Sequence, residues 1–124
     1  MGGLTYDTGA LIAAERNDRR TWRLHDGAIS QGLKPTVPAG VLAQAWRGGP
    51  QPRLSQFLRG CHIEALDEQL ARLVGAKSQA HASPDIVDVS VVVSARPRGD
   101  TVVTGDRRHV VPLAGSLGVP VVLV

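Results

Sequence analysis

The chain of 124 residues has very little of what several classes of protein need. It has one cysteine, Cys61, so an intramolecular disulfide is impossible and a reducing cytosol is the expected compartment. Aromatic residues make up 3% of the chain, too few for a platform on which single-stranded bases stack. No apolar run approaches the roughly 20 residues that span a bilayer, and no secretory leader is visible. We therefore expect a cytoplasmic protein that does not associate with membranes.

Basic residues, in contrast, are numerous. The formal net charge is +3, and nearly all basic residues are arginines. They gather in four clusters: Arg16/Arg19/Arg20/Arg23, Arg47/Arg53/Arg59, Arg96/Arg98 and Arg107/Arg108. Arginine suits phosphate partners such as a polyanion, but an arginine-rich solvated surface explains the same clusters.

Length and periodicity predict one α/β domain over residues 1–124. Strands are expected at 4–6, 34–37, 61–65, 101–104 and 120–124. Helices are expected at 11–14, 18–29, from Pro38 to about Trp46, at 51–58, after an Asp67 cap with Leu66, Leu70, Leu73 and Val74 on its apolar side, and at 108–117. This alternation predicts a mostly parallel sheet of about five strands with helices on both faces.

The stretch 83–93 gives conflicting signals. Its density of valine favours a strand. Ser83 as an N-cap, Pro84 at the first helical position and acids in the first turn favour a helix. We predict a helix that is buried on most sides and ends at 96–99.

Carboxylates follow this pattern to one edge of the sheet. Asp7 and Asp106 each follow a predicted strand, and the carboxyl ends of parallel strands share an edge. Asp85 and Asp88 lie one turn apart near the start of the 83–93 helix, which opens at the same edge. Hard oxygen ligands suit Mg²⁺ or Mn²⁺, and such an ion can activate water for attack on a phosphodiester.

Other catalytic constellations are poorly supported. No Ser/His/Asp or Cys/His arrangement is visible, and the four histidines lack zinc-ligand spacing, so we interpret each as a surface or hydrogen-bonded core residue. The string Asp7-Thr8-Gly9-Ala10 also occurs in aspartic proteases, but that all-β fold conflicts with the helical periodicity from Asp67 onward. A haloacid-dehalogenase-like phosphatase would need an aspartate at Gly9.

Four motifs, in order along the chain, resemble those of PIN domains, and in particular of the VapC-type toxins of bacterial toxin–antitoxin pairs. They are 7–12 (DTGALI), 37–49 (VPAGVLAQAWRGG), 85–88 (DIVD) and 103–106 (VTGD). The resemblance implies a PIN-like three-layer fold and a Mg²⁺- or Mn²⁺-dependent endoribonuclease that cleaves structured RNA, commonly tRNA or rRNA. It also implies a homodimer and inhibition by a cognate VapB-like antitoxin, which would bury a hydrophobic groove and direct a basic side chain at the acids.

The resemblance also assigns roles to individual residues. Asp7 would be the first metal ligand and Asp106 the acid after the fourth strand. Asp85, Asp88 or both would be the acids of the late helix, with Asp85 expected to be the indispensable one because it lies closest to the edge of the sheet. Thr104 would orient a ligand or a phosphate.

One position departs from the pattern. Gln44 stands where the family has an acid, so a negative charge is missing from the expected site. The result is either a more metal-demanding nuclease or a catalytically weak PIN-like module that binds RNA or protein. Alternatively, Gln44 simply faces water. The sequence leaves open the RNA target, the number of metal ions and the identity of the antitoxin.

Overall fold

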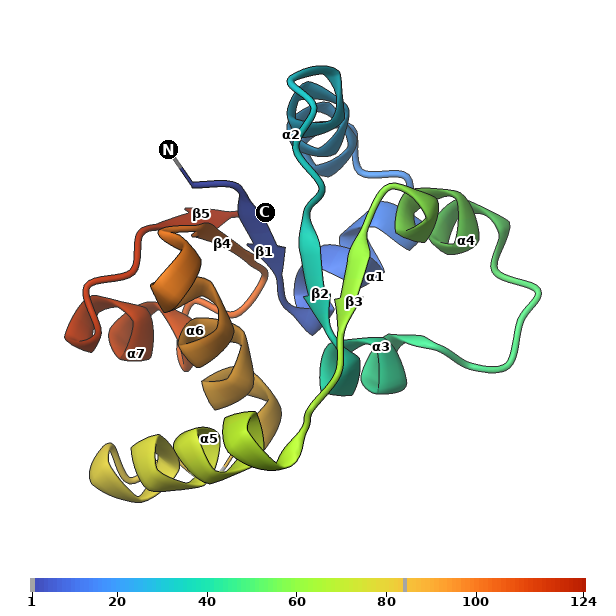
Figure 1. The fold of residues 1–124 in the computed structure, drawn as a ribbon. Helices are drawn as coiled ribbons and strands as arrows, with labels where there is room; N and C mark the ends of the chain where they lie inside the picture. Colours follow the sequence, from blue (N-terminus) through green and yellow to red (C-terminus); the bar gives the residue numbers. More distant parts are fainter. Residues whose placement is uncertain (1, 84) are drawn as a thin grey trace.

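The computed structural model describes residues 2–83 and 85–124 and contains a five-stranded sheet with helices on both sides (Figure 1). The strand order is β3-β2-β1-β4-β5, and every neighbouring pair is parallel. The strands are β1 (Leu4–Tyr6), β2 (Thr36–Pro38), β3 (His62–Glu64), β4 (Thr101–Thr104) and β5 (Val121–Leu123). The predicted parallel α/β architecture is confirmed.

Helices connect the strands. They are α1 (Thr8–Glu15), α2 (Arg19–Ser30), α3 (Ala39–Ala45), α4 (Pro52–Arg59), α5 (Glu68–Ala80), α6 (Ile86–Arg98) and α7 (Val110–Ser116). In Figure 1, α1, α2 and α4 lie on one side of the sheet, and α5, α6 and α7 lie on the other. In residues 2–83 and 85–124 no helix combines the length and the apolar character needed to cross a bilayer.

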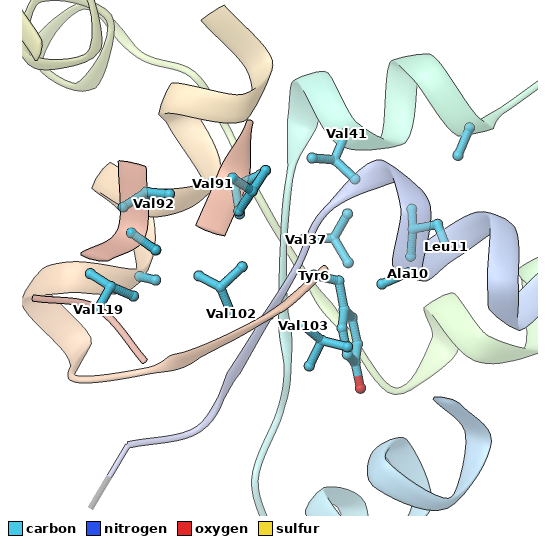
Figure 2. Packing of buried hydrophobic residues seen from close by; sticks show 14 of the residues in the cluster. Tyr6, Ala10, Leu11, Val37, Val41, Val91, Val92, Val102, Val103 and Val119 are labelled. Carbon is cyan, nitrogen blue, oxygen red and sulfur yellow. The ribbon is translucent and has the colours of Figure 1, made fainter. Parts of the chain in front are cut away.

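The core lies between the central strands and the two helices that face them. Val91 and Val92 of α6 approach the sheet from one side, and Leu11 of α1 approaches it from the other (Figure 2). Val102 and Val103 lie between them on β4, and all five side chains are fully buried. Because β1 and β4 are neighbours in the middle of the sheet, whatever follows them is held on a rigid base.

The valine-rich stretch forms the predicted helix. Seven consecutive residues of α6, from Val89 to Ala95, are buried. A helix that is covered on nearly all sides gains more from this burial than the modest helical penalty of valine costs. Gly99 ends it with a positive φ of 66°, as the predicted stop at 96–99 implies.

Several element boundaries were predicted wrongly. The first helix begins at Thr8 rather than Leu11, because the Asp7 side chain caps it. Pro38 ends β2 and is the N-cap of α3, so that helix begins one residue later than predicted, at Ala39. The N-cap of α6 is Asp85 rather than Ser83, and Pro84 lies outside the described residues.

Two predicted core positions are also wrong. Leu66 and Leu73 are exposed, at 47% and 44% of their full surface, whereas Val74 is buried and Leu70 partly so. Leu66 precedes the Asp67 cap, so it does not share the apolar face of α5.

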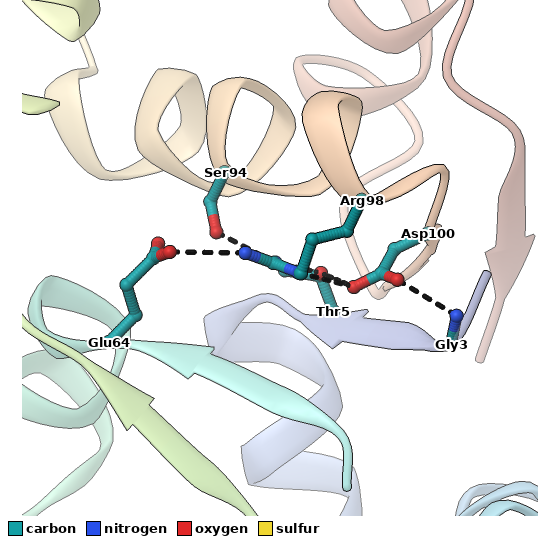
Figure 3. A network of polar contacts seen from close by, with 6 residues as sticks. All are labelled: Gly3, Thr5, Glu64, Ser94, Arg98 and Asp100. Carbon is teal, nitrogen blue, oxygen red and sulfur yellow. Dashed lines mark hydrogen bonds and ion pairs between the residues drawn. The ribbon is translucent and has the colours of Figure 1, made fainter. Parts of the chain in front are cut away.

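A polar network between α6 and the sheet ties α6 to β1 and β3 (Figure 3). The Arg98 guanidinium donates to Asp100 Oδ2 at 2.9 Å, to Glu64 Oε2 at 3.0 Å and to Thr5 Oγ1 at 2.8 Å. Burial alone would raise the pKa of Asp100, but hydrogen bonds from Arg98, Thr5 and Gly3 hold that pKa below its ordinary value. The carboxylate is therefore charged and paired inside the fold.

We expect Arg98→Met to destabilise the protein by about 2–4 kcal/mol, because it leaves the nearly buried Asp100 carboxylate without its cation. Arg72→Met is the matched control, since the Arg72–Glu68 pair is exposed on both sides and contributes little. Urea denaturation at neutral pH measures both. Equal, small losses would show that the network is dispensable. The wild-type advantage should also shrink as the pH falls through the depressed pKa of Asp100.

Candidate functional site

Segments far apart in the sequence meet at the carboxyl edge of the sheet, around a cavity of about 470 Å³. The residues that line it are Asp7, Thr8, Gly9, Gln44, Ser83, Asp85, Asp88, Asp106 and His109. All four predicted acids and Gln44 therefore border one space. The strand order explains this, because Asp7 follows β1 and Asp106 follows the adjacent β4.

Asp7 is 2% exposed and is held by several hydrogen bonds. Its Oδ1 accepts from the Ala10 N–H at 2.9 Å and from the Gly105 N–H at 3.3 Å, and its Oδ2 accepts from the Thr104 hydroxyl. Burial raises the pKa of Asp7, Asp106 raises it further, and these hydrogen bonds oppose the rise. A carboxylate that is buried, rigid and short of a full counter-charge is suited to a cation.

Thr104 connects two of the acids without lining the cavity. Its buried hydroxyl donates to Asp7 and accepts from the Asp106 N–H at 2.8 Å. The hydroxyl therefore bridges the two strand ends, and its role in orienting a ligand or a phosphate stays a prediction.

Two glycines allow the strand ends to approach closely. A Cβ at Gly9 would lie only 2.8 Å from the Gly105 Cα, so α1 and the turn after β4 are in backbone contact. A side chain at Gly9 would push Asp7 and Asp106 apart.

Asp85 and Asp88 differ in their surroundings. Asp85 is exposed and caps α6, accepting from the Asp88 N–H at 3.0 Å. Asp88 is half-buried, and its pKa is raised to about 6 by desolvation and by the negative charges of Asp85, Asp106 and Asp7. The geometry thus favours Asp88 over Asp85 as the metal-binding acid of this helix, whereas the sequence favoured Asp85; which of the two is essential stays a prediction.

His109 is the site residue that sequence reasoning missed. Its N–H donates to Asp106 Oδ1 at 2.8 Å and its Nδ1 lies 3.1 Å from Asp106 Oδ2. Desolvation opposes ionisation of Asp106, but these contacts hold its pKa below the ordinary value. The three-residue spacing after Asp106 was the available signal. The prediction of a hydrogen-bonded core histidine is confirmed for His25, which is buried and hydrogen-bonded to the Tyr6 hydroxyl.

The residues fit a divalent cation. One potential ligand atom from each of Asp88, Asp106 and His109 lies within 4.8 Å of the other two. Within the described ranges this is the only such group, and it includes neither Asp7 nor Asp85. Two carboxylates suit Mg²⁺ or Mn²⁺, and the imidazole shifts the preference toward a transition metal such as Mn²⁺.

Gln44 borders the cavity from α3 while remaining exposed to solvent. Its Oε1 accepts a hydrogen bond from the Thr8 hydroxyl, next to Asp7. The side chain is therefore part of the site wall and also faces water, but it adds no negative charge.

Comparison with known proteins supports the architecture. No protein-family profile and no curated protein matches the sequence. Among solved structures, a chain of FitAB bound to a DNA fragment named IR36 aligns over 97% of this chain and 94% of its own, with a TM-score of 0.58 and 18% identity. The fold is PIN-like. A chain of FitAcB from Neisseria gonorrhoeae aligns over 95% of both chains, with a TM-score of 0.56 and 18% identity. At this identity the PIN-like architecture is shared, and the chemistry must be argued from the residues of this chain.

Proposed function

We propose that this chain is a single PIN domain that acts as the toxin of a VapC-type toxin–antitoxin pair, as a metal-dependent endoribonuclease. The observation that carries the proposal is the cavity lined by Asp7, Asp85, Asp88 and Asp106. Desolvation and the negative charges of the neighbouring acids raise the pKa of Asp88 to about 6, a cost that a bound cation would offset.

Each residue has a distinct task in this proposal. Asp88, Asp106 and His109 would hold the ion, and Asp7, fixed by Thr104 and the Gly105 N–H, would complete the site from the β1 side. A bound Mg²⁺ or Mn²⁺ supplies an activated water and stabilises charge on the phosphodiester. Thr8 and Gln44 border the same cavity and can hydrogen-bond the phosphate oxygens of RNA such as tRNA or rRNA.

Partners follow from the same hypothesis. The proposed VapB-like antitoxin would cover an apolar hollow of about 510 Å³ between α3 and α4, where Trp46 is 42% exposed beside Leu42 and Leu58. It would also direct a basic side chain at the acids. A homodimer that meets its RNA in the cytoplasm completes the proposal.

A cleavage assay with purified, antitoxin-free protein tests the enzymatic part. We expect wild type to cleave total RNA in Mn²⁺, and Asp7→Ala and Asp7→Asn to leave it intact. Asp7→Asn is the sharper variant, because asparagine keeps an oxygen for the Ala10 and Gly105 N–H groups and the cap of α1. It removes the charge and, beside it, only the acceptor of the Thr104 hydroxyl. If all three proteins cleave alike, the activity is a contaminant or the site lies elsewhere.

The second candidate function is a non-enzymatic PIN-like module that binds RNA or a partner protein. Gln44 favours it, because the amide leaves the cavity with less charge to hold an ion. A stable complex with RNA, without cleavage in either Mg²⁺ or Mn²⁺, would support this alternative.

A further inference from the structure

A second, smaller hollow adjoins the acidic cavity. It has a volume of about 250 Å³ and shares Ser83 and His109 with the larger space. The residues that line it are His81, Ala82, Ser83, Arg108, His109, Pro112, Leu113 and Ser116. None of them is a carboxylate, so the surface changes from acidic to basic across His109.

Arg108 supplies the positive charge of this hollow. The residue is exposed, and in residues 2–83 and 85–124 its side chain forms no ion pair. Arg108 lies directly before His109, whose backbone N–H donates to Asp106 Oδ1 at 2.8 Å, so the residue adjoins the proposed ion site. Arg107, the preceding residue, is also exposed but borders neither hollow.

We propose that this basic hollow is a subsite for the RNA phosphate adjacent to the one that is cleaved. The inference rests on the proposed function, because it assumes that RNA crosses the acidic cavity. The bound ion would neutralise only the phosphate that it contacts. Asp85 and Asp88 would repel a neighbouring phosphate unless a positively charged side chain faced that phosphate. The guanidinium of Arg108 suits phosphate oxygens, and Ser83 adds a hydroxyl.

The size of the hollow agrees with this occupant. Pockets that enclose a whole small molecule have volumes of roughly 300–1,000 Å³. A space of about 250 Å³ that opens into a larger one instead suits one unit of a polymer that continues into the neighbouring site.

RNA binding by a matched pair of variants tests the subsite. Arg108→Gln and Arg107→Gln remove the same charge from adjacent residues, and both are made in an Asp7→Asn chain so that the RNA stays intact. Filter binding is measured at several salt concentrations with unfractionated transfer RNA and with a random-sequence oligoribonucleotide library. We expect Arg108→Gln to weaken RNA binding about 5- to 10-fold. It should also reduce the salt slope, which is the slope of log K for binding against log salt concentration, by about one, as the loss of one phosphate contact predicts. Arg107→Gln should weaken it by less than about 2-fold.

A conservative variant separates charge from shape. Arg108→Lys keeps the charge but loses the forked donor, so it should restore the salt slope and only part of the affinity. Equal effects of Arg107→Gln and Arg108→Gln would overturn the subsite, while cleavage by wild type would leave the proposed function standing. If wild type neither binds nor cleaves RNA, the proposed function fails and the subsite fails with it.

Discussion

Replacing Asp88 with asparagine should abolish metal-dependent RNA cleavage, by about 10³-fold or more, while making the metal-free protein more stable. The carboxylate of Asp88 belongs to the group of potential ion ligands, so its loss removes ligand and charge together. In the metal-free protein the same charge is unfavourable, because desolvation and three neighbouring acids raise the pKa of Asp88 to about 6. Mn²⁺ titration calorimetry, a cleavage assay and urea denaturation in EDTA measure the three quantities.

The sign of the pH dependence follows from that pKa. A carboxyl group whose pKa is higher in the folded than in the unfolded chain destabilises the fold when ionised. The cost is complete above about pH 6 and vanishes below the ordinary value of 3.8. Allowing for solvent screening of a half-buried group, it is about 1–2 kcal/mol. Metal-free wild type should therefore gain stability relative to Asp88→Asn as the pH falls from 6 to 4, and the two should converge.

Asp85→Asn is the control for this prediction. Asp85 is exposed, and asparagine can cap α6 as aspartate does, so the metal-free stability should change little. If Asp85→Asn abolishes cleavage and Asp88→Asn does not, the essential late acid is Asp85, as the sequence predicted. If Asp88→Asn destabilises the metal-free protein, the repulsion argument is wrong.

The negative charges of Asp7 and Asp88 are both unfavourable in the metal-free fold, and one explanation accounts for both. Hydrogen bonds hold Asp7 at a buried position where its negative charge is unfavourable. Three acids lie near Asp88, and the residues that line the cavity include no lysine or arginine, only His109, to balance them. A fold that served only its own stability would gain by replacing such residues with neutral ones. Their cost is repaid only when something positive binds, which is why they support an ion site.

The sequence predicts the architecture well because the architecture depends on features that are local or periodic. Alternating strands and capped helices suffice for a parallel sheet. The choice of a helix over a strand for α6 is right, although its cap is Asp85 rather than the predicted Ser83. Boundaries are harder, because one side chain can decide them. The carboxylate of Asp7 moves the start of α1 by three residues from the predicted Leu11, and the same atom belongs to the candidate site.

The site is only partly predictable for a different reason. The topology alone brings Asp7 and Asp106 together, since they follow adjacent strands. The balance between Asp85 and Asp88 depends on how far each is buried, which spacing along a helix does not reveal. The sequence does not distinguish His109 from an ordinary histidine, because its partner is a single aspartate three residues away, in a turn whose conformation the sequence leaves open.

Gln44→Glu should strengthen Mn²⁺ binding about 10-fold or more and accelerate RNA cleavage. Gln44 lies in the wall of the cavity, and its Oε1 already accepts from the Thr8 hydroxyl. Glutamate keeps that acceptor and adds a negative charge beside a divalent cation, where about 1.4 kcal/mol of extra attraction is enough for a 10-fold change. Titration calorimetry with Mn²⁺ and cleavage rates over a range of Mn²⁺ concentrations measure the gain.

Gln56→Glu separates a local effect from a change in net charge. Gln56 is an exposed glutamine on α4 that does not border the cavity, so the same substitution there should leave Mn²⁺ affinity nearly unchanged. If Gln44→Glu creates cleavage that wild type lacks, the natural protein is the weak, binding type of PIN-like module. If wild type and Gln44→Glu both cleave RNA and differ only in Mn²⁺ affinity, the natural protein is a nuclease that needs more metal. Equal behaviour of Gln44→Glu and Gln56→Glu would mean that the amide at this position has no part in holding the ion.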